Sequence, residues 1–284
     1  MYRFRLAVVT LLTAAASPAF AQDAAPTAPP PAVTINGSVS VVSDYRLRGV
    51  SQSDDHAALQ GTLTITHESG LYVGTFGSNL AGWGTFGGAN LELDAIGGYK
   101  RRIATDATVD VGLTWYMYPG GANKTDYAEG YAKLTGTRGP ATLTASVYYA
   151  PKQQALGRYY RNGAEAATGV YSAPGDKRDN LYLAGDGAIA IPRTPLTARA
   201  HIGHSHGNDG LGPNATSAAP TGDYWDWGVG ADVAYRSLTF NVSYVDTDIT
   251  ARDAAYLQPF FSKGQDGTGS IADGKVVVSL TAAF

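Results

Sequence analysis

The sequence predicts an all-β fold, a transmembrane antiparallel up-and-down β-barrel of about 12 strands. Three observations lead to this prediction. From Val276 to Phe284 every second residue is apolar, so one face of a final strand is wholly apolar. The same two-residue alternation recurs along the chain, as expected where one strand face meets lipid and the other a polar lumen. The composition, with 35 Gly, 18 Tyr and 2 Met, favours strands and tight turns over helices.

The amino-terminal residues predict export. Arg3 and Arg5 precede an apolar run that is too short to span a bilayer, and an A-x-A pattern ends at Ala21. We therefore expect a signal peptide at 1–21, cleaved between Ala21 and Gln22. The chain has no cysteine, which excludes a lipoprotein anchor and a disulfide framework.

A short leader is expected between the signal peptide and the barrel. Residues 22–32 are rich in Pro and Ala and poor in large apolar side chains, so they predict an extended periplasmic segment, with the barrel at 33–284. Loss of the two basic residues of the signal changes the formal net charge from −3 to −5. So weak a charge argues against nucleic acid as a partner.

The first strand is expected from Val33 to Arg48. Its apolar residues alternate with polar ones, and Asp44, Arg46 and Arg48 would face the lumen near its outer end. The remaining strands are expected where the same alternation recurs. They cover about 59–66, 71–78, 91–99, 109–117, 127–134, 142–149, the two segments flanking 192–195, 224–235, 238–245 and 276–284.

The expected connections alternate in length. Those at 68–70, 100–107, 135–140, 191–195 and 236–237 are short, whereas the others are longer, up to about 151–180. Short periplasmic turns and long outer loops are typical of bacterial outer-membrane barrels, and an even strand number places both termini in the periplasm. We expect a Gram-negative outer-membrane location. The expected partners are membrane lipid and the barrel-assembly machinery, which would act through the final strand and Phe284.

One part of the sequence resembles a known family. Residues 42–53, V-S-D-Y-R-L-R-G-V-S-Q-S, are followed by L-Q-G at 59–61 and by G-L-Y-V-G-T-F-G-S-N at 70–79, with Glu92-x-Asp94 and Gly98-Tyr99 after them. This order closely resembles the amino-terminal signature of the TorF-type family of proteobacterial porins. His56 and Phe76 depart from it, where Pro and Trp are expected. The resemblance implies an outer-membrane barrel assigned as a porin largely by its architecture.

Charged residues on the lumenal faces are candidates for lining a pore. Opposed charges across a pore would set up a transverse field that sorts solutes by charge. They could equally neutralise one another across a filled lumen. The pore-lining candidates are Asp44, Arg46, Arg48, Glu92, Asp94, Asp110, Arg199, Asp226 and Asp232.

The longest expected loop contains a basic and aromatic cluster, Arg158, Tyr159, Tyr160 and Arg161. These residues are candidates for a constriction that folds into the lumen and contacts solutes. The loop could equally be a disordered surface tip. The aromatic residues at strand ends are expected in the girdles at the two membrane interfaces, and the alternative for them is a sugar-binding track.

No metal site, cofactor or catalytic centre is expected. In a strand, His201 would point away from His204 and His206, so the three could not converge on a metal ion. Adjacent His204 and Ser205 face opposite ways and cannot form a base and nucleophile pair. The expected function is therefore passive diffusion of small hydrophilic solutes through a narrow porin, not catalysis. A structural or adhesive barrel is the alternative, followed by a lipid-modifying enzyme.

Overall fold

The computed structural model describes residues 31–82, 85–207, 210–212, 222–250 and 270–284. The expected signal peptide, its cleavage site between Ala21 and Gln22, and most of the leader lie outside these residues.

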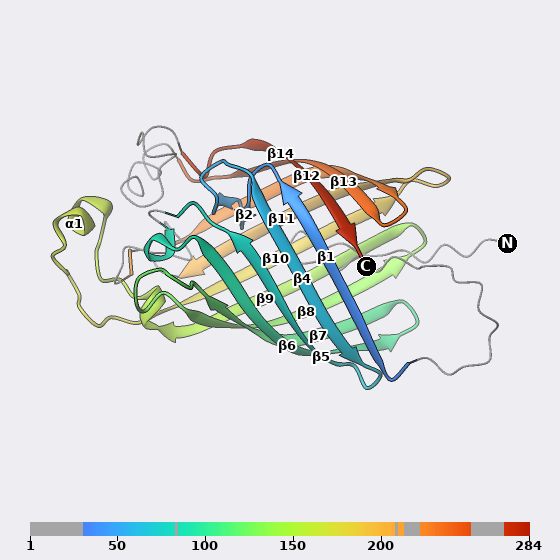
Figure 1. Ribbon diagram of the computed structural model, residues 1–284, viewed down its shortest axis with the longest axis horizontal. Coiled ribbons are helices and arrows are strands. Elements are labelled where there is room, and N and C mark those ends of the chain that lie inside the picture. The colour runs from blue at the N-terminus through green and yellow to red at the C-terminus, as the bar shows by residue number, and fades with distance from the viewer. Residues whose placement is uncertain (1–30, 83–84, 208–209, 213–221, 251–269) are drawn as a thin grey trace.

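The described residues form one closed antiparallel barrel of twelve strands (Figure 1). Each strand pairs with the next along the chain, and pairing of the first with the last closes the ring. This confirms the predicted fold class and strand number. The strands are β1 (Val33–Val42), β4 (Ala58–His67), β5 (Leu71–Asn79), β6 (Leu91–Ala104), β7 (Ala107–Met117), β8 (Tyr127–Arg138), β9 (Ala141–Gln153), β10 (Arg178–Ala190), β11 (Leu196–Gly207), β12 (Tyr224–Tyr235), β13 (Leu238–Thr247) and β14 (Lys275–Ala283).

The two ends of the barrel differ in their connections. Short turns at 68–70, 105–106, 139–140, 191–195 and 236–237 form one end, which we call the turn end. Connections at 43–57, 80–90, 118–126, 154–177, 208–223 and 248–274 belong to the other, which we call the loop end. Figure 1 shows α1 (Gly163–Thr168) beyond the loop end. The other helical segments are η1 (Thr85–Gly88) and η2 (Gln154–Leu156), and among the described residues no helix is long and apolar enough to cross a membrane.

The outer wall is apolar because every second strand residue points away from the lumen. Val276 and Leu280 on β14, and Phe284 just after it, are 60%, 50% and 60% exposed on this wall. The seam between β1 and β14 is completed by two backbone hydrogen bonds of 2.9 Å between Gly37 and Phe284. A Cβ at Gly37 would lie 2.6 Å from the Phe284 ring, so glycine is what lets the ring cover the seam.

The first strand is shorter than the sequence predicts, because the chain leaves the wall after Val42. Residues 43–57 fold back as a segment that we call the plug hairpin; it contains β2 (Arg46–Leu47) and β3 (Val50–Ser51). Both central residues of its two-residue turn have positive φ, 51° at Arg48 and 80° at Gly49, as a tight hairpin of this kind requires. Asp44, Arg46 and Arg48 therefore lie on the plug hairpin and not on a wall strand.

Candidate functional site: the barrel lumen and its plug

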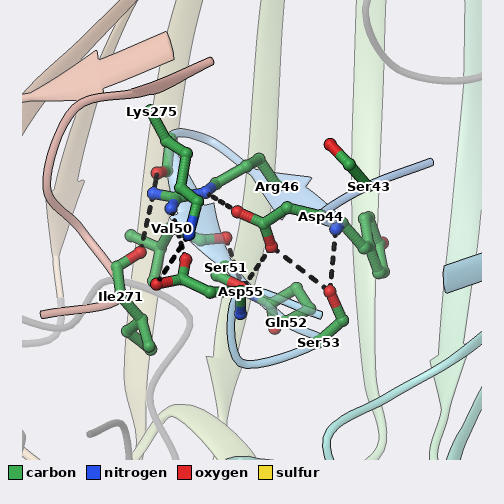
Figure 2. Close-up of polar contacts among 12 residues, drawn as sticks. Ser43, Asp44, Arg46, Val50, Ser51, Gln52, Ser53, Asp55, Ile271 and Lys275 are labelled. Carbon is green, nitrogen blue, oxygen red and sulfur yellow. Dashed lines mark hydrogen bonds and ion pairs between the residues drawn. The ribbon is translucent and has the colours of Figure 1, made fainter. Parts of the chain in front are cut away.

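The plug hairpin is organised around the buried carboxylate of Asp44 (Figure 2). Asp44 Oδ1 accepts hydrogen bonds from the hydroxyls of Ser51 at 2.5 Å and Ser53 at 3.2 Å, and Oδ2 pairs with Arg46 Nε at 2.5 Å. Ser53 Oγ also accepts a hydrogen bond from the Tyr45 backbone N–H at 2.8 Å. These contacts give the hairpin its own polar core. Burial beside Glu92 raises the pKa of the Tyr45 phenol, which keeps it neutral.

Arg46 ties the plug hairpin to the connection between β13 and β14. Its Nη1 donates to the carbonyl of Ile271 at 2.8 Å, and its Nη2 pairs with Asp55 at 2.7 Å. Asp55 in turn pairs with Lys275 at 3.2 Å, and the Ser51 N–H donates to Ile271 at 2.9 Å. Figure 2 shows these residues gathered on one side of the hairpin. The plug is therefore fixed to a second segment far away in the sequence.

Arg48, at the turn of the hairpin, reaches the opposite wall of the barrel. Its Nη2 contacts both carboxylate oxygens of Glu129 on β8, at 2.6 and 2.7 Å, and its Nη1 donates to Asn180 Oδ1 on β10 at 3.0 Å. The guanidinium lies 4.2 Å from the centre of the Tyr182 ring. In the closed ring β8 and β10 lie across from β1 and β4. Arg48 and Glu129 are both buried, so breaking this pair would cost roughly 3–5 kcal/mol.

Loops of the loop end pack on the plug hairpin. Tyr159 and Tyr160 are 4% and 6% exposed, and the backbone N–H groups of both donate to the carbonyl of Leu211. Val50 of the plug belongs to the same apolar cluster. We call this cluster the outer cap; it comprises Val50, Tyr159, Tyr160, Ala166, Leu211, Tyr224, Ile249, Ile271 and Ala272.

The four constriction candidates separate in the structure. Tyr159 and Tyr160 are in the outer cap, whereas the backbone N–H of Arg158 donates to Asp176 at 2.9 Å. Arg161 has an exposed side chain and pairs with Glu165 on α1 at 3.1 Å. Hydrogen bonds from the Ser172 hydroxyl and the Arg161 backbone hold the pKa of Glu165 below its usual range.

Beneath the plug hairpin the lumen holds a cavity of about 260 Å³. Most of its lining residues carry polar side chains, and those with hydroxyl or amide groups are Ser38, Ser40, Gln60, Thr62, Thr114, Thr239, Asn241, Ser243, Ser279 and Thr281, besides four tyrosines. Five of the predicted pore-lining residues border it: Asp44, Arg46, Asp94, Arg199 and Asp232. Arg199 and Asp232 form an ion pair across β11 and β12.

The other predicted pore-lining residues do not border this cavity. Asp110 accepts a hydrogen bond from the Tyr72 hydroxyl at 2.6 Å. Asp226 accepts one from Tyr182 and lies 3.0 Å from His201 Nε2. Glu92 is fully buried on β6, and Arg48 crosses the lumen to Glu129.

The three histidines of β11 diverge as the alternation requires. His201 points inward, between Asp186 at 2.7 Å and Asp226 at 3.0 Å. His204 lies against the exposed Trp225 ring, with centres 4.5 Å apart, and His206 contacts Asp223 at 2.5 Å. Among the described residues no group of three or more His, Cys, Asp or Glu side chains is arranged to hold a metal ion.

Sequence reasoning missed the residues that receive the plug. Glu129 and Asn180 bind Arg48, but Glu129 lies in a strand with weak alternation and Asn180 directly follows the polar run 176–179. Lys133, over the rings of Tyr131 and Tyr148, was also missed. The only available signal was their shared inward face, which does not identify partners on other strands.

Comparison with known proteins places the chain in a family. The family model of a bacterial protein of unknown function (Gcw_chp) matches residues 24–284. The chain belongs to this family. No curated protein matches it.

Solved barrels share the fold of this Gcw_chp protein at low sequence identity. The NanC porin is 11% identical, with a TM-score of 0.51, over 88% of this chain and 99% of the porin. The KdgM porin in complex with disordered oligogalacturonate is 7% identical, with a TM-score of 0.47, over 88% and 98%. The COG4313 outer membrane channel of Pseudomonas putida F1 is 11% identical, with a TM-score of 0.46, over 90% and 97%. The likeness to the NanC porin supports a porin-type barrel fold.

Proposed function

We propose that this Gcw_chp protein is an outer-membrane porin that passes small hydrophilic solutes passively. The observation that carries the proposal is a cavity lined by many polar side chains inside a closed barrel whose outer wall is apolar. Hydroxyl and amide groups can replace part of a solute's hydration shell without holding it tightly, which passive passage requires. The resemblance of residues 42–99 to the TorF-type signature supports the same function.

The plug hairpin makes the proposed pore narrow. Twelve strands leave less room than the sixteen to eighteen of wide porins, and the hairpin occupies part of that room. The paired charges Arg48–Glu129 and Arg46–Asp44 support neutralisation across the loop end more than an open transverse field. We therefore expect small single-channel steps from the wild-type protein.

Planar-bilayer recording of the refolded protein tests this proposal. Discrete steps are expected from the wild type, and larger or more frequent steps from Arg48→Ala, because the plug then loses its contact with the far wall. Arg138→Ala, in a strand end beside a short turn, is the matched control for the lost charge. A folded, heat-modifiable barrel that gives no steps in any of the three proteins would rule out a porin.

A structural or adhesive barrel is the second candidate. The outer cap favours it, because its buried tyrosines cover the plug at the loop end. Exchanging residues 154–177, the connection between β9 and β10, for a short Gly/Ser linker separates the two. Loss of binding to host or matrix ligands with no gain in conductance would support the adhesive function.

A further inference from the structure

We infer that the cavity beneath the plug hairpin binds small organic cations, with the carboxyl group of Asp94 as their contact. Asp94 is 4% exposed and borders the cavity, and its buried Oδ1 accepts no hydrogen bond from the described residues. Buried carboxylate oxygens are costly without a donor, so this wall favours a ligand that brings N–H groups.

Aromatic rings surround this carboxylate. Asp94 pairs across the sheet with Phe76 on β5 and with Tyr116 on β7, so the three side chains share the inner face. The ring of Tyr45, from the plug hairpin, lies 5.9 Å from that of Phe76. All three rings border the cavity. A carboxylate among aromatic faces suits an ammonium or guanidinium group, which gains both an ion pair and cation–π contacts.

The basic side chains around the lumen are engaged elsewhere. Arg46 pairs with Asp44 and Asp55, Arg48 with Glu129, and Arg199 with Asp232. Their carboxylate partners offset their charge and hold them in place.

Lys133 is the remaining basic group on the cavity wall, and it lies over the Tyr131 ring, 4.8 Å from its centre. Asp94 on β6 pairs with Tyr116 on β7, which in turn pairs with Tyr127 on β8, so Tyr127 lies at the same height in the barrel as Asp94. Lys133 is six residues further along β8 from Tyr127, roughly 20 Å at the rise of a strand. It is therefore too far away to neutralise Asp94 directly.

Binding of methylguanidine to the refolded barrel in detergent, measured by calorimetry, tests the inference. Methylurea has the same shape without the charge, so we expect it to bind at least about tenfold more weakly. The Asp94→Asn variant should bind methylguanidine more weakly than the wild type by the same factor. The control variant Asp106→Asn, in the exposed turn between β6 and β7, should bind it as the wild type does. Equal binding of the two probes to the wild type would overturn the inference, and this comparison needs no variant.

This inference rests on the proposed function, because a solute reaches the cavity through the barrel. Bilayer recording on the same preparations keeps the two apart. Conductance steps without a binding preference for methylguanidine would support the porin function and contradict the cation site. Selective binding of methylguanidine without conductance steps would support the cation site and contradict the porin function. If Asp94→Asn does not refold, the probe comparison on the wild type still decides.

Discussion

The loop end and the turn end of the lumen differ in the side chains that occupy them. At the loop end, the plug hairpin, Arg48 and the outer cap fill the barrel with buried ion pairs and rings. Toward the turn end, the wall carries short hydroxyl and amide side chains around the cavity, together with one ion pair, Arg199–Asp232. Buried charges demand specific partners, whereas hydroxyls can bond to water or to one another. We therefore expect the loop end to be sensitive to single substitutions, and the hydroxyl and amide side chains toward the turn end to tolerate them.

The largest effect is expected where the plug meets the far wall. Arg48→Ala leaves Glu129 buried and without its cation, so we expect a loss of roughly 3–5 kcal/mol in the free energy of unfolding. Urea unfolding from lipid vesicles measures it. The double variant Arg48→Met with Glu129→Met removes both charges and should recover most of the loss. If the double variant is as unstable as Arg48→Ala, the buried charge is not the cause.

The turn of the plug hairpin should show the next largest effect. Gly49 has φ 80°, and a Cβ there would lie 2.4 Å from Thr247 Cγ2, so Gly49→Ala should cost about 1–3 kcal/mol. Gly61→Ala on β4 is the matched control, because its Cβ would meet nothing closer than 3.9 Å. Equal unfolding midpoints for the two variants would contradict a tightly fitted plug.

A much smaller effect is expected from the hydroxyl wall. Ser40 Oγ and Thr281 Oγ1 form a hydrogen bond of 2.8 Å. Replacing both, as Ser40→Ala with Thr281→Val, removes donor and acceptor together and should change stability by less than about 1 kcal/mol. A loss as large as that of Arg48→Ala, measured in the same urea series, would erase the distinction between the two ends.

The smallest effect is a pH dependence confined to the loop end. The folded-state pKa of Glu165 is lowered, chiefly by the Ser172 hydroxyl. Its contribution to the stability of the folded state is therefore present at pH values above the usual carboxyl pKa range and is lost as the pH falls through the folded-state pKa. Hydrogen exchange should therefore show α1 losing protection in acid while the strands keep theirs. In Glu165→Gln the exchange of α1, after correction for the intrinsic rate, should not depend on this titration.

The sequence predicted the wall of the barrel better than its contents. Alternation places Val276 and Leu280 outward because lipid and lumen are two uniform environments, and no knowledge of partners is needed. The same alternation continues from Val42 to Arg48, but there it reflects a hairpin inside the lumen. The contacts that decide this, from Arg48 to Glu129 and from Arg46 to Ile271, join residues 81 and 225 positions apart. A local pattern carries no information about such pairs.

The seam between β1 and β14 has a consequence for folding kinetics. Eleven of the twelve strand pairings join neighbours along the chain, so they can form one hairpin after another with little loop-closure entropy. The seam alone is remote, since its Ser40–Thr281 bond joins residues 241 positions apart. Until it forms, the sheet has two unpaired edges that can capture other strands. Closure of this single pairing is then the step at which a slow phase and off-pathway aggregation compete.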